Sequence, residues 1–179
     1  DVYKRQDIAR ELALNSNIPI CPGINNVHKL SDEQLKTKCE AIGYPLLVKS
    51  SAGGGGIGMS VVQNFKDLAS AIEKTSNLAA KSFGNGDIFI EKFITNARHI
   101  EIQVFGFGAK GSVHLFERDC SMQRRYQKII EESPAPEVDR ELINNMAQAA
   151  VKLSSDVKYE GAGTVAVSYT HLRAHETLT

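Results

Sequence analysis

Lys-Ser-Ser-Ala-Gly-Gly-Gly-Gly-Ile-Gly-Met, residues 49–59, is the stretch that decides the fold. Five of the six residues from Gly53 to Gly58 are glycine, which loses more backbone entropy on folding than any other residue. Such a run is typical of a loop whose backbone N–H groups approach an anion closely, because no Cβ atoms stand in the way. Lys49 would add a positive charge for the phosphate oxygens. These residues predict a phosphate-binding loop, with a flexible linker as the alternative.

Two short apolar runs flank this glycine-rich segment. Pro-Leu-Leu-Val at residues 45–48 and Met-Ser-Val-Val at residues 59–62 are both typical of strands. A Walker A loop needs Gly-Lys followed by Ser or Thr at the start of a helix, whereas here the lysine comes first and a strand follows. The order strand, glycine segment, strand therefore predicts a mobile hairpin that closes over a nucleotide.

The composition argues against several classes of partner. The 21 Lys and Arg residues equal the 21 Asp and Glu residues, so no net charge favours nucleic acid or an anionic membrane. The sequence has neither an 18-residue apolar run nor a signal peptide, which favours a cytoplasmic protein. Cys21, Cys39 and Cys120 lack C-x-x-C spacing and are typical of reduced thiols rather than of disulfides or a zinc site. We therefore expect no nucleic-acid partner and no membrane partner.

Hydrophobic periodicity and capping residues predict a mixed α+β fold. Ser31 and Gln34 form a capping box at the start of a helix that runs to Ile42, and Gly43 ends it. Further helices are predicted at residues 7–15, after Asn64, and at 136–157. Strands are predicted at 88–94, 98–105 and 112–117, and another begins at 161. Hairpins between these strands favour a largely antiparallel sheet.

The strand predicted at residues 98–105 has two different faces. Ile100, Ile102 and Val104 alternate with His99, Glu101 and Gln103. Successive side chains of a strand point to opposite faces, so we expect the apolar set in the core. The polar set is explained either by solvent exposure or by a ligand.

A second segment is rich in charge. Residues 117–136 read Glu-Arg-Asp-Cys-Ser-Met-Gln-Arg-Arg-Tyr-Gln-Lys-Ile-Ile-Glu-Glu-Ser-Pro-Ala-Pro, and we expect four basic side chains to face four acidic ones. Paired, fixed charges suit recognition of phosphate or carboxylate. An RNA-binding segment is the competing hypothesis, weakened because acids balance bases and Tyr126 is the only interleaved aromatic residue. The basic residues are Arg118, Arg124, Arg125 and Lys128, and the acidic ones are Glu117, Asp119, Glu131 and Glu132.

Three motifs in order resemble biotin carboxylases. They are the glycine-rich segment, the Glu-Lys-Phe-Ile-Thr-Asn-Ala-Arg-His-Ile-Glu-Ile-Gln-Val-Phe run at 91–105 and the charged segment at 117–136, and the resemblance extends over residues 7–166. The resemblance implies an ATP-grasp fold that uses MgATP to activate bicarbonate and passes the carboxyl group to biotin on a carrier. Thr-Asn-Ala-Arg-His at 95–99 and the Ser-Ser-Ala-Gly run are most similar to urea carboxylases.

The resemblance implies a division of the chain. We expect a helix leading into the lid at residues 7–17, the ATP-grasp lid subdomain at 18–92 and the start of the catalytic subdomain at 93–167. Residues 1–6 and 168–179 do not continue the patterns beside them, and we expect both to be non-native scars.

The resemblance also implies roles for individual residues. Lys49 would contact the ATP phosphates, and Met59 would contact adenine. Glu91, Lys92 and Ile94 would form the hinge that reads adenine, largely through backbone groups. The residues expected to bind the nucleotide are Lys49, Gly53, Gly54, Gly55, Gly56, Gly58, Met59, Glu91, Lys92, Ile94, His99 and Gln123, and the expected catalytic residues are Lys128, Arg124 and Arg125.

Lys128 would help to hold bicarbonate, with Arg124 and Arg125 shaping that region. Tyr126 stands where relatives carry His or Asn, so that nucleotide contact departs from the pattern. No metal ligand is expected within the chain, because the Mg²⁺-binding glutamate of the family falls where Ala166 stands. We therefore expect the intact parent to use ATP and Mg²⁺, and this polypeptide alone to be inactive. A biotin carrier, a carboxyltransferase and a second parent subunit are the expected partners.

Two other functions stay open. Another ATP-grasp ligase, of the carbamoyl-phosphate synthetase type, shares the nucleotide fold. A nucleotide-binding or structural piece without activity is the alternative outside the enzyme class.

Overall fold

The computed structural model describes residues 6–52, 58–124, 126–170 and 173–176. The chain divides into two compact units, a first unit of Asp1–Ile8 with Cys21–Thr95, and a second unit of Ala9–Ile20 with Asn96–Thr179. The division into a lid subdomain at 18–92 and a catalytic subdomain from 93 stays a prediction.

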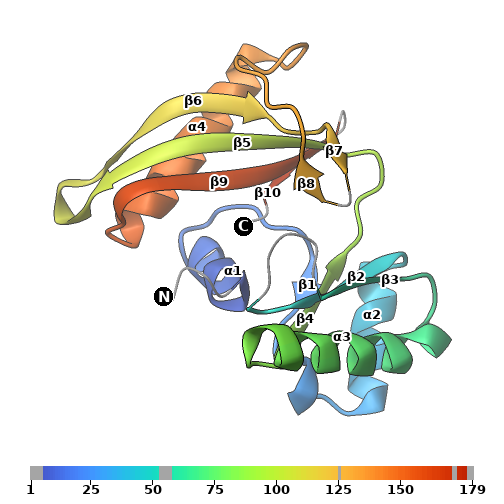
Figure 1. Ribbon diagram of the computed structural model, residues 1–179. Helices are drawn as coiled ribbons and strands as arrows, with labels where there is room; N and C mark the ends of the chain where they lie inside the picture. Colours follow the sequence, from blue (N-terminus) through green and yellow to red (C-terminus); the bar gives the residue numbers. More distant parts are fainter. Residues whose placement is uncertain (1–5, 53–57, 125, 171–172, 177–179) are drawn as a thin grey trace. The chain divides into compact units, whose positions relative to one another are not determined.

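The first unit is a four-stranded antiparallel sheet covered on one face by two helices (Figure 1). Its strands are β1 (Gly23–Ile24), β2 (Leu46–Ser50), β3 (Met59–Val62) and β4 (Ile88–Lys92), in the spatial order β1-β4-β2-β3. Leu46, Val48 and Ile90 point to the face that packs against α2 (Asp32–Ile42) and α3 (Leu68–Phe83). The unit also contains the short helices η2 (Val27–Lys29) and η3 (Phe65–Asp67).

Local capping explains where the helices of the first unit begin and end. The predicted capping box is confirmed: the Gln34 N–H donates to Ser31 Oγ at 3.3 Å, and the Ser31 N–H donates to Gln34 Oε1 at 3.1 Å. Gly43 follows the last helical residue, as predicted. Asn64 caps a single 3₁₀ turn, because its side chain accepts from the Lys66 N–H, and α3 begins only at Leu68.

Strands β2 and β3 form the predicted hairpin around the glycine-rich segment. They pair antiparallel, with Lys49 opposite Met59. The Ser50 N–H donates to the Gly58 carbonyl at 2.9 Å, which extends the pairing toward the loop. Residues 53–57, which include the predicted phosphate-binding Gly53, Gly54, Gly55 and Gly56, lie outside the described residues.

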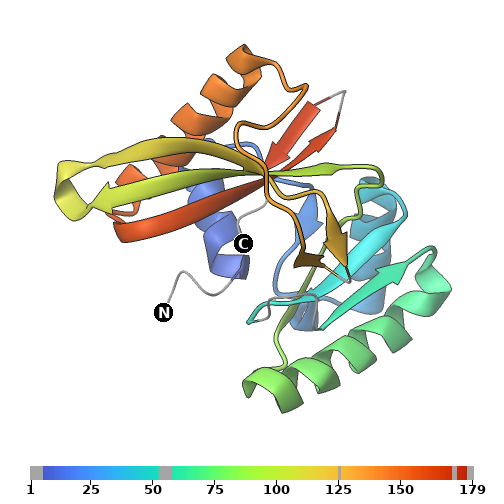
Figure 2. The ribbon, with the colours of Figure 1, turned by 45° about the horizontal axis from the view of Figure 1, so that its top comes forward.

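The second unit is a four-stranded antiparallel sheet with one long helix across one face (Figure 1). Its strands are β5 (Arg98–Phe107), β6 (Ser112–Asp119), β9 (Glu160–Thr170) and β10 (Arg173–Glu176), in the order β10-β9-β5-β6. The adjacent strands β6, β5 and β9 run side by side in both ribbon views (Figure 2). The unit also holds η4 (Gly108–Lys110) and the two-residue strands β7 (Gln123–Arg124) and β8 (Gln127–Lys128).

The helix α4 (Arg140–Asp156) covers the apolar face of this sheet. Ile100, Ile102 and Val104 are at most 3 % exposed and pack against it, which confirms the predicted core face of β5. The prediction that the helix begins at 136 is wrong, because the Asp139 side chain caps the Glu141 N–H and Glu137 has a positive φ of 53°. The second unit also includes most of α1 (Gln6–Asn15), where Ala13 packs with Leu153.

The strand predicted to begin at residue 161 extends into the segment, from residue 168, that was expected not to continue it. Ser168 pairs with His99 and Tyr169 with Arg98, so β9 runs on to Thr170. Backbone pairing with β5 sustains a strand whatever side chains it carries, and this accounts for the difference. Residues 171–172 and 177–179 lie outside the described residues.

Two compositional predictions can be compared with the structure. Cys21, Cys39 and Cys120 are buried free thiols, as predicted. No helix within the described residues is both long and apolar enough to cross a membrane.

Candidate functional site

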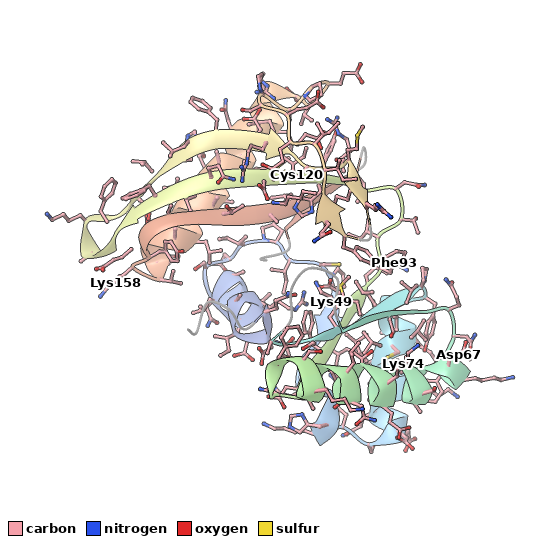
Figure 3. The ribbon with its side chains drawn as sticks, in the orientation of Figure 1. Lys49, Asp67, Lys74, Phe93, Cys120 and Lys158 are labelled. Carbon is pink, nitrogen blue, oxygen red and sulfur yellow. The ribbon has the colours of Figure 1, made fainter. Side chains whose placement is uncertain are left out.

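Lys49 is the second-last residue of β2 and precedes the first glycine of the run, Gly53, by four positions (Figure 3). Its ammonium donates to Glu91 Oε1 on β4 at 3.0 Å and lies 5.3 Å from the centre of the Phe89 ring. Both charged side chains are nearly buried, with 10 % and 7 % exposure. Among the described residues, Glu91 is the single hydrogen-bond partner of the Lys49 ammonium, so two of its three N–H donors are left for a ligand.

The two described residues on the far side of the loop lie next to Lys49 in the sheet. Gly58 has a φ of +73°, and a Cβ added there would lie 3.1 Å from Ser50 Cβ. Both the backbone conformation and the close approach favour glycine at this position. Met59 is half-buried and stands opposite Lys49 in the sheet.

The predicted adenine hinge at the end of β4 is held by backbone and side-chain bonds. The Lys92 N–H donates to the Pro22 carbonyl at 2.8 Å, and the Phe93 N–H donates to the Pro45 carbonyl at 3.1 Å. The Ile94 N–H takes part in no hydrogen bond within the described part of the chain. The Lys92 ammonium donates to the Gly43 and Tyr44 carbonyls at 3.0 and 2.8 Å, so this side chain ties β4 to the end of α2.

In the second unit, a buried carboxylate on β5 forms hydrogen bonds with two of the basic residues of the charged segment. Glu101 is 1 % exposed, and its Oε1 accepts from Arg118 Nη2 at 2.5 Å while its Oε2 accepts from Lys128 Nζ. The exposed Glu131 contacts the same two cations, at 2.7 Å from Arg118 and 3.9 Å from Lys128. We call this group, which consists of Glu101, His99, Arg118, Cys120, Lys128 and Glu131, the Glu101 cluster.

The charges of the Glu101 cluster determine which of its groups ionise. Burial by itself would raise the pKa of Glu101, but contacts with His99 and Lys128 outweigh it and lower this pKa to about 2. Burial and the neighbouring Glu101 carboxylate raise the pKa of the Cys120 thiol to about 12. Cys120, labelled in Figure 3, is therefore a protonated, packed thiol rather than a nucleophile.

The Glu101 cluster does not fit a divalent metal ion. Glu101, Cys120 and Glu131 offer ligand atoms within 4.8 Å of one another, and within the described residues no other group of three such side chains does. However, both oxygens of Glu101 already accept from cations and the Cys120 thiol is protonated.

The other predicted residues of the second unit differ in their contacts. His99 Nε2 is 3.7 Å from Glu101 Oε2 and has no hydrogen-bond partner among the described residues. Gln123 is half-buried, and its side-chain amide donates to the Cys120 carbonyl at 2.8 Å. Arg124 is exposed on β7, opposite Gln127, and Arg125 lies outside the described residues.

Two buried carboxylates of the charged segment pair with arginines outside it, contrary to the expectation that its own bases would face them. Glu117 Oε1 accepts from Arg140 Nη1 at 2.7 Å and from the Ala135 N–H at 3.1 Å. Asp119 accepts from Arg98 and from the Ser121 N–H. The alternation of β6 explains this, because Glu117 and Asp119 point away from the face that carries Arg118. The same alternation, applied to the sequence at residues 117–119, would have placed Glu117 and Asp119 on the face opposite to Arg118.

Similarity to a known family covers nearly the whole chain. Residues 5–176 match the family model described as carbamoyl-phosphate synthase L chain, ATP binding domain. Biotin carboxylase 1 of Bacillus subtilis is 43 % identical over 166 residues, which are 93 % of this chain and 37 % of that protein. The α subunit of mitochondrial methylcrotonoyl-CoA carboxylase from Arabidopsis thaliana is 46 % identical over 84 % of this chain and 20 % of its own length. The chain thus spans well under half of these curated relatives.

Solved structures show the same fold. A biotin carboxylase from Campylobacter jejuni, in a β,γ-ATP complex, superposes with a TM-score of 0.90 at 38 % identity, over 98 % of this chain and 39 % of that one. The biotin carboxylase domain of 2-oxoglutarate carboxylase from Hydrogenobacter thermophilus, with MgADP, ADP and bicarbonate, gives 0.89 at 34 % identity over 98 % and 39 %. The predicted α+β ATP-grasp fold is confirmed. The chain belongs to the family of ATP-binding domains of the carbamoyl-phosphate synthase L chain, and its fold is that of the ATP-grasp part of biotin carboxylases.

Proposed function

We propose that this chain is the ATP-binding part of a biotin-dependent carboxylase, in which MgATP activates bicarbonate and the carboxyl group passes to biotin on a carrier. The observation that carries this proposal is the Lys49 ammonium. It is nearly buried, is held by Glu91 at 3.0 Å and keeps two donors for a ligand beside the glycine-rich segment. A lysine held in this way supplies a fixed point charge to phosphate oxygens.

We assign the other predicted residues of the first unit to the same nucleotide. Gly53, Gly54, Gly55, Gly56 and Gly58 would cover the phosphates, and Met59 would pack on adenine. The Ile94 N–H, which no other group in the described part of the chain uses, would donate to the base, supported by the bonds that fix Lys92 and Phe93 beside it. The roles that the resemblance implies for His99 and Gln123, at the ribose and the phosphates, stay predictions.

In the second unit, we assign bicarbonate to Lys128, and we propose that Arg124 and Arg125 shape that region. The Lys128 side chain is 34 % exposed, so a small anion can reach it. Within the described residues its ammonium has one hydrogen bond, to Glu101, which leaves donors for an oxyanion. The bicarbonate-bound relative from Hydrogenobacter thermophilus supports an anion of this kind in the family.

Nucleotide binding by the chain itself tests the central assignment. We expect a fluorescent ADP analogue to bind saturably to the purified chain and to be displaced by ATP but not by uridine triphosphate. We also expect no bicarbonate-dependent ATP hydrolysis, because Ala166 stands where the resemblance implies the Mg²⁺-binding glutamate. Absence of saturable binding by a folded chain would contradict the nucleotide site.

The final acceptor is a finer proposal. Thr95-Asn96-Ala97-Arg98-His99 and the Ser-Ser-Ala-Gly run at 50–53 favour a urea carboxylase over carboxylases of acyl-CoA or pyruvate. Urea-dependent ATP consumption by the intact carboxylase would support it, and consumption that depends on acetyl-CoA or pyruvate instead would contradict it. The family name keeps carbamoyl-phosphate synthesis as the alternative reaction, and biotin-dependent turnover separates the two.

The proposed function implies partners. A biotin carrier and a carboxyltransferase would accept the carboxyl group. The parent would form a homodimer, because the biotin carboxylase domain from Hydrogenobacter thermophilus crystallised as a dimer. We also propose a cytoplasmic location, supported by the three buried free thiols. We expect no nucleic-acid or membrane partner, in line with the balanced charge.

A further inference from the structure

Two carboxylates in the Glu101 cluster contact the same two cations but differ in burial. Glu101 is 1 % exposed and takes one hydrogen bond from Arg118 and one from Lys128. Glu131 is 36 % exposed and makes a hydrogen bond with Arg118, whereas its nearest oxygen is 3.9 Å from the Lys128 ammonium. Lys128 is therefore hydrogen-bonded to the buried carboxylate and only loosely paired with the exposed one.

The backbone around Lys128 gives this lysine little support of its own. Lys128 lies on β8, a strand of two residues that pairs only with the equally short β7 within the described residues. The ends of the charged segment are held separately, since Asp119 and Glu132 exchange backbone hydrogen bonds of 2.8 and 3.0 Å and Glu117 accepts from the Ala135 N–H. Through Lys128, Glu101 contacts the part of the charged segment that lies between Asp119 and Glu132.

The position of Glu101 itself does not depend on the cluster. It lies in β5, which is paired on both sides, opposite Arg118 on β6 and Ala166 on β9. Its neighbours Ile100 and Ile102 are fully buried against α4. A rigid central strand thus holds the carboxylate, and the carboxylate holds the side chains of Arg118, from the neighbouring strand β6, and of Lys128, from the two-residue strand β8.

We propose that Glu101 is a positioning residue for the anion site, which holds Lys128 and Arg118 in place so that bicarbonate meets two cations that are already ordered. This inference rests on the proposed function, because bicarbonate is assigned to Lys128 there. Long Lys and Arg side chains lose much rotamer freedom when they are fixed, so an anion that had to order them itself would bind more weakly.

A simpler role for Glu101 predicts the opposite result. If Glu101 only reduced the positive charge of the cluster, removing it would strengthen the attraction for an anion. The same would hold for Glu131, which faces the same cations. The two carboxylates are therefore matched: loss of either removes one negative charge, but only loss of Glu101 releases Lys128.

The test is a titration of the purified chain with sodium bicarbonate, followed through the ¹⁵N amide shifts of residues 127–131. We compare the wild type with Glu101→Gln and with the matched Glu131→Gln. We expect Glu101→Gln to bind bicarbonate about tenfold more weakly, the effect of losing one charge-assisted hydrogen bond that orders the site. Glu131→Gln is expected to bind as tightly as the wild type or up to about threefold more tightly.

A second variant keeps the inference testable if Glu101→Gln does not fold. Glu101→Asp retains the charge with a shorter reach, and we expect binding between that of the wild type and that of Glu101→Gln, at an unchanged melting temperature. Binding by Glu101→Asp that equals the wild type, or tighter binding by Glu101→Gln, would overturn the positioning role. No saturable shift in the folded wild type would instead reject bicarbonate at Lys128, and with it that part of the proposed function.

Discussion

The two lysines assigned to ligands, Lys49 and Lys128, are held by buried glutamates in different ways. Lys49 is itself nearly buried and lies in β2, which pairs with strands on both sides, so its position follows from the sheet. Lys128 is one third exposed on a two-residue strand, so its position follows from Glu101. In the first unit the lysine is the sensitive residue. In the second, the glutamate is as important as the lysine that it holds.

Substitution of Lys49 is expected to have the largest effect. Lys49→Met removes a charged donor of the phosphates while keeping the length of the side chain, and we expect nucleotide affinity to fall about a hundredfold, or about 3 kcal/mol. Displacement of a fluorescent ADP analogue measures this loss. Lys74→Met, at an exposed lysine of α3 labelled in Figure 3, is the matched control and should stay within about twofold of the wild type. Equal affinities of the two variants would remove Lys49 from the site.

Acid titration separates Glu101 from the other carboxylates. The pKa of Glu101 is about 2 in the folded chain against an ordinary value of 4.5, so its stabilisation is present above about pH 4.5 and is lost as the pH falls toward 2. The titratable and charged groups that face it are His99, Arg118, Cys120, Lys128 and Glu131.

Urea unfolding at pH 7 and pH 3 measures this contribution. We expect the wild type to lose roughly 2 kcal/mol more than Glu101→Gln between these pH values. The comparison with Glu101→Gln is needed because the pKa values of Glu117 and Asp119 are lowered as well, after burial is outweighed by Arg140 and by Ser121 with Arg98. Parallel pH profiles of the two proteins would mean that Glu101 is not the anchor of its cluster.

Substitution of two glycines in the first unit is expected to have a smaller effect on the free energy of unfolding, and the two substitutions can be compared with each other. Gly58 and Gly84 have nearly equal φ values, +73° and +72°, but a Cβ at Gly58 would lie 3.1 Å from Ser50 Cβ and one at Gly84 would meet nothing within 4 Å. We expect Gly84→Ala to lower the free energy of unfolding by about 1 kcal/mol, the cost of a left-handed backbone. Gly58→Ala should cost more, and chemical denaturation of both variants compares them. Equal losses of unfolding free energy in the two variants would show that Ser50 moves to make room for the added Cβ.

The smallest effect is expected at an exposed ion pair. Lys36 and Glu40 are one helical turn apart on α2, 4.0 Å from each other, and more than half of each side chain is exposed. Glu40→Gln should change the free energy of unfolding by less than about 0.5 kcal/mol, because solvent screens such pairs. A change in unfolding free energy as large as that expected for Glu101 would mean that burial does not decide how much a carboxylate stabilises this protein.

Much of the fold could be predicted because its signals are local. The capping box of Ser31 and Gln34 involves residues three positions apart, and the alternation of Ile100, Ile102 and Val104 is visible within five residues. The start of α4 could not be placed so well, because Pro136 is compatible with a helix and the capping role of Asp139 competes with it. The end of β9 depended on pairing with Arg98 and His99, which lie far earlier in the chain.

The contacts of the candidate site could be predicted between residues that are close in the sequence, but not between residues that are distant in it. Lys49 and Met59 flank the glycine-rich segment, so the hairpin brings them together as the sequence predicts. Glu101 was visible only as one residue of a polar face, since its role depends on Arg118 and Lys128, which are 17 and 27 residues away. Arg98 and Arg140 likewise reach Asp119 and Glu117 across the sheet and from α4.

The sequence by itself determined the two strands around the glycine-rich segment, the capped helices and the family resemblance, because each depends on residues close together in the chain. Only the tertiary structure decided which charges pair. Ion pairs depend on distances in space, and burial decides which of them matter: Glu101 and Glu131 contact the same cations, yet only the first is shielded from water. Low dielectric and fixed geometry turn one of two similar carboxylates into the centre of the site.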